Sequence, residues 1–271
     1  MESQSQPSTL VRQPAVAGHF YSSDPAELQR NIQHYMGLAD LKSSNRPKAL
    51  IAPHAGYIYS GPVAATAYAT LAPVKNDISR VILLGPAHRV FVRGLALSSA
   101  THFATPLGQI KIDQEAVNRI KSLPQVVVSD QAHALEHSLE VHLPFLQFIL
   151  NDFLLVPLVV GEATPEEVAE VLNLLWGGDE TLIVISSDLS HYHDYETACN
   201  IDRLTTQAIE KLQLDKIDSQ QACGCRPVCG LLKIAREKNL NVKTLDLRNS
   251  GDTAGPRDRV VGYGAYSFCN Y

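Results

Sequence analysis

The sequence predicts an α/β fold in which helices flank a central mixed, largely parallel sheet. Two observations support this class. Short, continuous runs of Val, Ile and Leu are typical of strands that are buried on both faces. These runs alternate along the chain with amphipathic stretches of helical period, which is the pattern of a layered α/β protein. The chain has 271 residues, enough to bury a large core around such a sheet.

Six segments have the character of strands. The first four are continuous apolar runs, and the last two contain alternating or glycine-bearing apolar residues near the end of the chain. In order, they are 48–53, 80–86, 153–161, 180–188, 242–250 and 259–268.

Helices are expected between these strands. Segment 24–38 begins with Asp24 as a cap and Pro25 in the first turn, and "TPEE" at the start of 164–176 resembles a capping box. The remaining predicted helices are 61–71, 113–123, 138–150 and 200–212. Residues 1–11 are rich in Ser, Gln and Pro, so we expect a disordered tail followed by a single domain over 12–271.

Composition excludes several classes of protein. The net charge of −5 gives no basic footprint for nucleic acid. The sequence contains no apolar run of 18 residues and no secretory signal, so we expect a cytoplasmic protein that does not enter a membrane. It also lacks the G-x-S-x-G, P-loop and G-x-G-x-x-G motifs.

Five cysteines are present, and we expect them to be reduced. Three of them form the cluster "CGCRPVC" over 223–229. Its C-x-C-x3-C spacing matches neither a zinc ribbon nor a common iron–sulfur site. We therefore interpret the cluster as small residues packed at the start of a helix, with metal binding as the weaker alternative.

A histidine follows the C-terminal end of each of three predicted strands. These are His54 in "KALIAPH", His88 in "RVILLGPAH" and His191 in "TLIVISSDLSH", the last preceded by Asp188. Sites in α/β folds lie at the carboxyl ends of strands, so these imidazoles are expected at one rim if the strands run parallel. Such a group suits a transition metal or proton transfer near neutral pH. Taken singly, each histidine is more simply a hydrogen-bonded loop residue.

A second histidine cluster lies in "HALEHSLEVHLPF". Its H-x-x-E-x-H order is one residue longer than the inverted zinc-protease motif, so that class is excluded. On a helix, His137 and Glu140 would share a face and could support a neighbouring site. The alternative is an exposed polar face opposite Leu139, Leu143 and Leu146.

Seven motifs together resemble the Memo family, whose microbial members are called AmmeMemoRadiSam system protein B. They are "RQPAVAGHFY", "IAPHAGYIYSGPVAATAY", "LLGPAHR", "TPLGQIKID", "EHSLEVHLPFLQ", "ISSDLSHYH" and "RVVGYGAYSF", and they span Arg12 to Phe268 in order. The resemblance implies a fold similar to that of the class III, non-haem iron extradiol dioxygenases.

The resemblance also implies a site. It assigns metal ligands to His54, His88 and His191, and acid–base roles to His191 and Asp188. The expected substrate contacts are Phe20, Tyr59, His137, Glu140 and Asp252. The family's animal member uses a late cysteine as a further ligand, and counting places it near Thr253, where this chain has none. We therefore expect Fe(II) or Zn(II) on histidines, with Asp252 as a candidate carboxylate ligand.

Three functions are compatible with the resemblance. The first is a metal-dependent oxidoreductase of extradiol-dioxygenase type acting on a small molecule. The second is a module that binds a small molecule or peptide without turnover. The third is a partner of AMMECR-type and radical-SAM proteins in a modification pathway; this chain lacks the C-x3-C-x2-C motif of the radical enzyme itself.

Overall fold

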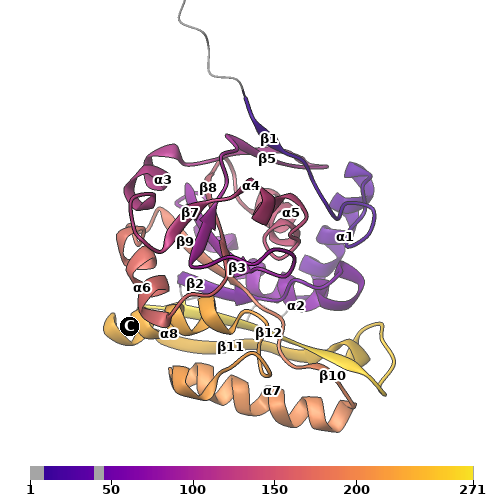
Figure 1. The fold of residues 1–271 in the computed structure, drawn as a ribbon. Coiled ribbons are helices and arrows are strands. Elements are labelled where there is room, and N and C mark those ends of the chain that lie inside the picture. Colours follow the sequence, from indigo (N-terminus) through magenta and orange to yellow (C-terminus); the bar gives the residue numbers. More distant parts are fainter. Residues whose placement is uncertain (1–8, 40–45, 271) are drawn as a thin grey trace, which may run out of the picture.

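The computed structural model describes residues 9–39 and 46–270 of the chain (Figure 1). Most of the predicted N-terminal tail, residues 1–8, lies outside the described residues. Val11, which the prediction placed in that tail, instead belongs to the short strand β1 (Val11–Arg12) and pairs with His102.

One large sheet dominates the structure and has the strand order β10-β12-β2-β9-β3-β8-β4-β7, with β11 paired to β12. Its strands are β2 (Pro47–Ala52), β3 (Arg80–Pro86), β4 (Leu95–Leu97), β7 (Val126–Val128), β8 (Leu154–Val160), β9 (Thr181–Ser186), β10 (His191–His193), β11 (Asn241–Asn249) and β12 (Val260–Cys269).

The four strands at the centre of this sheet are parallel. β9 lies between β2 and β3, and β8 follows on the far side of β3. These strands are buried almost throughout, which explains their continuous Val, Ile and Leu content. The outer pairs β12/β2, β10/β12, β11/β12 and β4/β8 are antiparallel, so the sheet is mixed as predicted.

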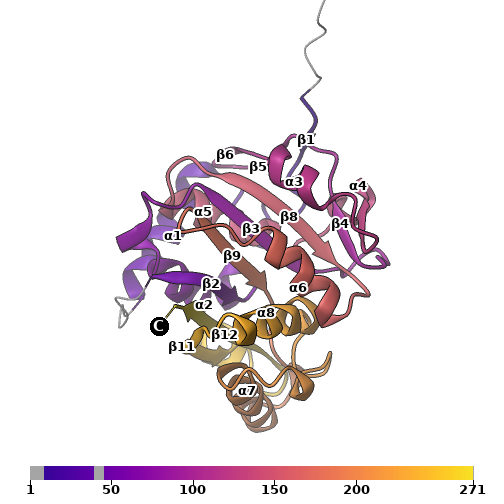
Figure 2. The ribbon, with the colours of Figure 1, turned by 90° about the vertical axis from the view of Figure 1, so that its left-hand side faces the viewer.

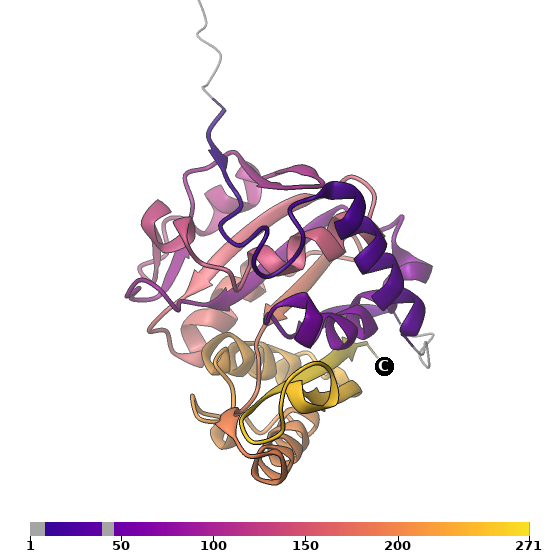
Figure 3. The same cartoon turned by 90° about the vertical axis from the view of Figure 1, so that its right-hand side faces the viewer.

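Helices cover both faces of the sheet. Helices α6 (Pro165–Leu174) and α8 (Cys225–Glu237) pack against each other, and α8 packs on β3 and β9 (Figure 2). On the opposite face, α2 (Tyr57–Ala69) packs on β2 and β12 and contacts α1 (Pro25–Leu38) and α5 (Leu143–Ile149) (Figure 3). Helix α7 (Tyr195–Glu210) lies against β11 and β12.

Smaller elements complete the fold. A three-stranded sheet joins β1 to β5 (His102–Thr105) and β6 (Gly108–Lys111). Short helices are α3 (Gln114–Ile120) and α4 (Asp130–Ala134), and single 3-10 turns lie at Ala72–Val74, Glu140–His142, Leu214–Lys216 and Ser250–Asp252. No helix within residues 9–39 and 46–270 has the length and apolar character required to span a membrane.

Three predicted helices differ from the structure, and one of them, 200–212, is α7, which begins five residues earlier at Tyr195. Segment 138–150 is a 3-10 turn followed by α5, which begins one residue before Pro144, so His137 and Glu140 do not share a helical face. Helix α2 begins at Tyr57, four residues before the predicted start at Gly61. The earlier start is stabilised by tertiary contacts, because Tyr57 is buried, its N–H donates to the Phe20 carbonyl and its hydroxyl donates to the Val141 carbonyl.

Candidate functional site

The parallel central strands end at one rim, where a cavity of about 730 Å³ opens. Because β2, β9 and β3 are neighbours and run in the same direction, the residues that follow them converge. His54 follows β2, Asp188 and His191 follow β9, and His88 follows β3; all four line the cavity. The predicted convergence at a common rim is therefore present.

His54 is fixed in orientation by a serine at the end of β9. Its Nδ1 lies 2.6 Å from Ser186 Oγ, and the same hydroxyl donates its hydrogen to the Ser138 carbonyl at 2.6 Å. Ser186 Oγ must therefore accept from His54, so the proton of the neutral ring is on Nδ1. Nε2 of His54 is left with a free lone pair.

His88 is oriented by a buried carboxylate. Nδ1 of His88 donates to Glu136 Oε1 at 2.9 Å, which again leaves Nε2 as the free nitrogen. Glu136 also accepts backbone N–H groups of His88, His137 and Ser138. Burial alone would raise the pKa of Glu136, but these hydrogen bonds outweigh it and lower the pKa to about 2. Such a carboxylate is typical of the support behind a metal-binding histidine.

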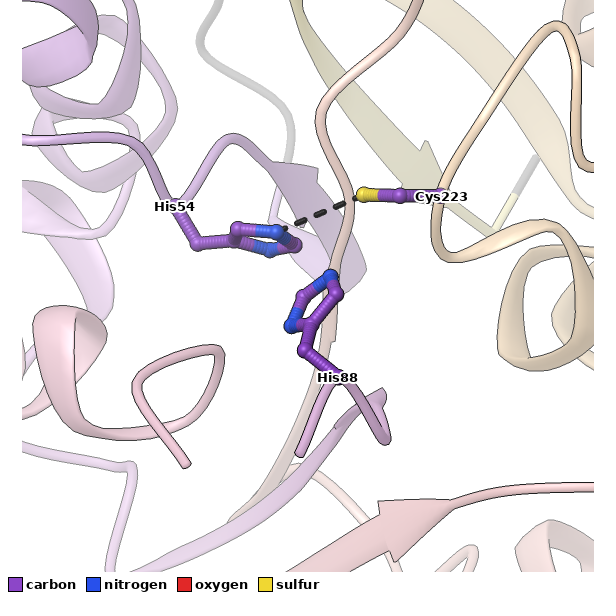
Figure 4. Close-up of side chains that lie close together, drawn as sticks. All are labelled: His54, His88 and Cys223. Atoms are coloured by element: carbon purple, nitrogen blue, oxygen red, sulfur yellow. Dashed lines mark hydrogen bonds between the residues drawn. The ribbon is translucent and has the colours of Figure 1, made fainter. Parts of the chain in front are cut away.

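The third side chain at this point is Cys223. Its Sγ lies 3.3 Å from His54 Nε2, and the close-up shows it facing both imidazoles (Figure 4). One ligand atom each from His54, His88 and Cys223 fall within 4.8 Å of one another. From the sequence no cysteine is expected here, whereas the structure places Cys223 beside the two imidazoles.

The predicted position near Thr253 lies between β11 and β12, whereas Cys223 precedes α8 and packs directly on the end of β9. The Cys223 N–H donates to the Asp188 carbonyl at 3.3 Å, and the Gly224 N–H donates to Ser187 Oγ at 3.0 Å. A side chain at Gly224 would place its Cβ 2.5 Å from the Ser186 carbonyl oxygen. The signal in the sequence was thus a Cys-Gly pair at a helix start.

This donor set fits a divalent transition metal. Two neutral imidazoles and one thiolate are ligands for zinc, iron and copper, and three protein ligands leave a position open for substrate or water. Burial keeps the pKa of His54 well below its usual value, so its 3.9 Å approach to Asp188 is not an ion pair. Burial and the Asp188 charge raise the pKa of Cys223, so without a metal the thiol keeps its proton, beside His54 Nε2.

Asp188 and His191 lie next to this donor set. Asp188 is buried, accepts the His54 N–H at 2.8 Å, and has its pKa raised to about 6 by burial. His191 donates from Nδ1 to the Leu189 carbonyl at 2.8 Å, so its Nε2 is the free nitrogen. Its orientation thus comes from Leu189 rather than from Asp188. Within the described residues, His191 belongs to neither cluster of possible metal ligands.

The predicted substrate contacts divide into two groups. Phe20 and His137 line the cavity with ring centroids 4.8 Å apart, and His137 also stacks on His88. Tyr59 is 39% exposed in the first turn of α2 and does not line the cavity.

Glu140 and Asp252 lie elsewhere. Glu140 is fully buried and its carboxylate is saturated by the N-terminal segment, from the Arg12 guanidinium, the Tyr21 hydroxyl and the N–H groups of Ala15 and Val16. Asp252 accepts from the Tyr195 hydroxyl at 2.7 Å and from the Asn249 N–H. Neither carboxylate lines the cavity, and within the described residues Asp252 belongs to neither group of possible metal ligands, whereas Cys223 belongs to one of them.

Comparison with known proteins gives a consistent result over almost the whole chain. The family model described as Memo-like protein matches residues 12–267. A MEMO1 family protein of Sulfolobus acidocaldarius is 35% identical, covering 94% of this chain and 98% of the relative. A second, from Saccharolobus solfataricus, is 36% identical over 96% and 99%.

Among solved structures, the chain is similar to an uncharacterized protein from Escherichia coli K12, JW3007. The two are 14% identical, with a TM-score of 0.48 over 79% of this chain and 98% of that one.

Proposed function

Because this chain belongs to the Memo-like protein family, we propose that it is a metalloenzyme that holds one divalent ion on His54, His88 and Cys223 and acts on a small molecule. The observation that carries the proposal is the agreement of tautomers. Ser186 and Glu136 hold the protons of both imidazoles on Nδ1, so both Nε2 lone pairs are free beside one thiol.

We propose Fe(II) as the working ion, with Zn(II) as the alternative. Either metal, when bound, supplies a Lewis acid, and iron also supplies the redox chemistry of a dioxygenase-like oxidoreductase. The protein supplies the rest of the site. Three protein ligands would leave a coordination position for substrate or water, and the cavity volume of about 730 Å³ suits a small molecule.

Proton transfer is assigned to Asp188 and His191. With a pKa of about 6, Asp188 exchanges a proton near neutral pH, and the free Nε2 of His191 is a second acceptor on the same wall. Neither group competes for the metal position. Asp188 or His191 could therefore accept the proton of a substrate hydroxyl that binds to the metal.

A thiolate ligand requires a reduced cysteine. All five cysteines are free thiols in the structure, and Cys223 must remain so to bind a metal. We therefore place the protein in a reducing compartment such as the cytoplasm.

Elemental analysis of the purified protein tests the metal site. We expect one iron or zinc per chain, lost in His54→Ala/His88→Ala and in Cys223→Ser. His34→Ala, which alters an exposed histidine in α1, serves as the control and should keep the metal. A wild-type protein that stays metal-free after anaerobic Fe(II) loading would contradict the proposal.

Catalysis needs a separate measurement. Oxygen uptake by the iron-loaded protein with a catechol, absent in Cys223→Ser, would support a dioxygenase-like reaction. A protein that binds metal and the catechol but consumes no oxygen would instead be a ligand-binding module.

A further inference from the structure

The cavity is lined by one arginine whose charge is not paired with any described residue. Arg89 follows His88 directly and lines the cavity, and its side chain makes no hydrogen bond or ion pair with any described residue. Of the described residues that line the cavity, Arg89 is the only Lys or Arg. Its positive charge reaches His137 on the inner wall: burial is the main cause that lowers the pKa of His137 to about 4, the Glu136 charge opposes this, and the Arg89 charge adds to the lowering.

Among the described residues that line the cavity, no acidic side chain forms an ion pair with Arg89. Asp188 is the only carboxylate among the described lining residues, and it is buried and holds the backbone N–H groups of His54 and Ala55. A divalent ion with one thiolate would add a further net positive charge.

The wall beside Arg89 is suited to a flat ring. His88 and His137 stack with their planes 15° apart, and Phe20 packs against His137. The three rings together form an aromatic part of the cavity wall that includes the metal-binding His88. A planar molecule on this surface would have one end beside the donor set and the other beside Arg89.

From this arrangement we infer that the substrate is a small aromatic or otherwise planar molecule that carries a carboxylate, and that Arg89 binds the carboxylate and determines specificity for it. The inference rests on the proposed function in treating this cavity as the substrate site. A single planar guanidinium matches one carboxylate in a bidentate pair. A phosphate dianion would call for more donors than Arg89 alone provides.

A matched pair of probes tests the inference without turnover. 4-Hydroxybenzoate and 4-hydroxybenzamide have nearly the same shape and differ in charge. Binding of each to the full-length, chelator-treated protein would be measured by isothermal titration calorimetry, so that no carboxylate can bind to a metal instead. We expect the acid to bind about twofold to fivefold more tightly, as for an exposed ion pair, and the preference to weaken in high salt.

Variants assign the preference to a residue. Arg89→Gln should abolish it and Arg89→Lys should retain part of it, whereas Arg203→Gln, an exposed position on α7, should leave it intact. Equal binding of acid and amide by the wild type, or a preference that persists in Arg89→Gln, would overturn the inference. Tighter binding of phenyl phosphate than of the acid would overturn the choice of carboxylate. The result is independent of metal content, so failure of the metal site and failure of this inference can be told apart.

Discussion

Replacing Glu136 by Gln would test the support behind the metal-binding histidines. The side chain of Glu136 is 1% exposed, and its two oxygens accept four hydrogen bonds, from His88 N and Nδ1, His137 N and Ser138 N. Glutamine has nearly the same shape but only one acceptor oxygen. Its NH2 group would face at least one buried N–H, leaving that donor unsatisfied.

The loss of stability can be estimated in two ways. An unsatisfied buried donor costs about 1–3 kcal/mol, and the remaining bonds lose their charge assistance. Independently, lowering a carboxyl pKa from 4.5 to about 2 corresponds to about 3 kcal/mol of stabilisation of the charged form. We therefore expect Glu136→Gln to lower the free energy of unfolding by about 3 kcal/mol, and to weaken metal binding by about 10- to 100-fold.

The same carboxylate predicts a pH dependence with a defined sign. Its pKa in the folded protein lies below that of the unfolded chain, so the stabilisation is complete above about pH 4.5 and is lost as the pH falls towards 2. Urea unfolding of wild type and Glu136→Gln between pH 7 and pH 3 would show the two curves converging in acid. Glu115→Gln, exposed on α3, is the control and should change stability by less than about 0.5 kcal/mol. A Glu136→Gln protein as stable as wild type at pH 7 would refute this reasoning.

Three further predictions concern the metal-binding side chains. Because burial raises the pKa of Cys223, binding of a metal must release the thiol proton. Zinc affinity, measured by competition with a chelator, should therefore rise about tenfold per pH unit between pH 6 and 8. A zinc affinity that does not change with pH would exclude a thiolate ligand. Ser186→Ala removes the acceptor that fixes His54 and should weaken zinc binding by about tenfold or more, whereas Ser267→Ala in β12 should not. Gly224→Ala places a Cβ 2.5 Å from the Ser186 carbonyl oxygen, so we expect it to lower the free energy of unfolding by about 1–3 kcal/mol, measured by thermal unfolding, and to abolish metal binding. Gly37→Ala is the control, because its Cβ would meet nothing within 4 Å. Equal behaviour of the two variants would contradict the packing argument.

Much of the site could be predicted from the sequence because it depends on strand direction. Continuous apolar runs identified the buried parallel strands, and residues after their C-terminal ends had to meet at one rim. That reasoning brought His54, His88, Asp188 and His191 together, and the structure places all four around one cavity. The mixed sheet flanked by helices was likewise confirmed.

What could not be predicted are contacts between segments far apart in the chain. Cys223 is 169 residues from His54, and only the packing of α8 on β9 brings them together. Glu136 and Ser186 lie within the motifs "EHSLEVHLPFLQ" and "ISSDLSHYH", but their roles depend on which nitrogen of a neighbouring ring they contact, which the motifs do not show. Glu140 was placed in the site by its nearness to His137 in sequence, yet it points away to the N-terminal segment.

The short strands were also missed, for a local reason. β4 and β7 have three residues each, too few to show a period, and β10 contains Tyr192 at a φ of 64°, where its register with β12 shifts. Tyr192 therefore breaks the extended pattern that identifies a strand.

The place of β12 in the sheet has a consequence for synthesis of the chain on the ribosome. β12 pairs with β2, β10 and β11. One edge of β2 therefore has no hydrogen-bonding partner until β12 is translated, more than two hundred residues later. At 5–20 residues per second, that wait lasts about 10–40 s. Once β9 has emerged and paired with β2, the other edge of β2, next to the loop that holds His54, stays open until β12 is made, and such an edge favours pairing with other chains. The nascent protein should therefore depend on a holding chaperone until residues 260–269 emerge.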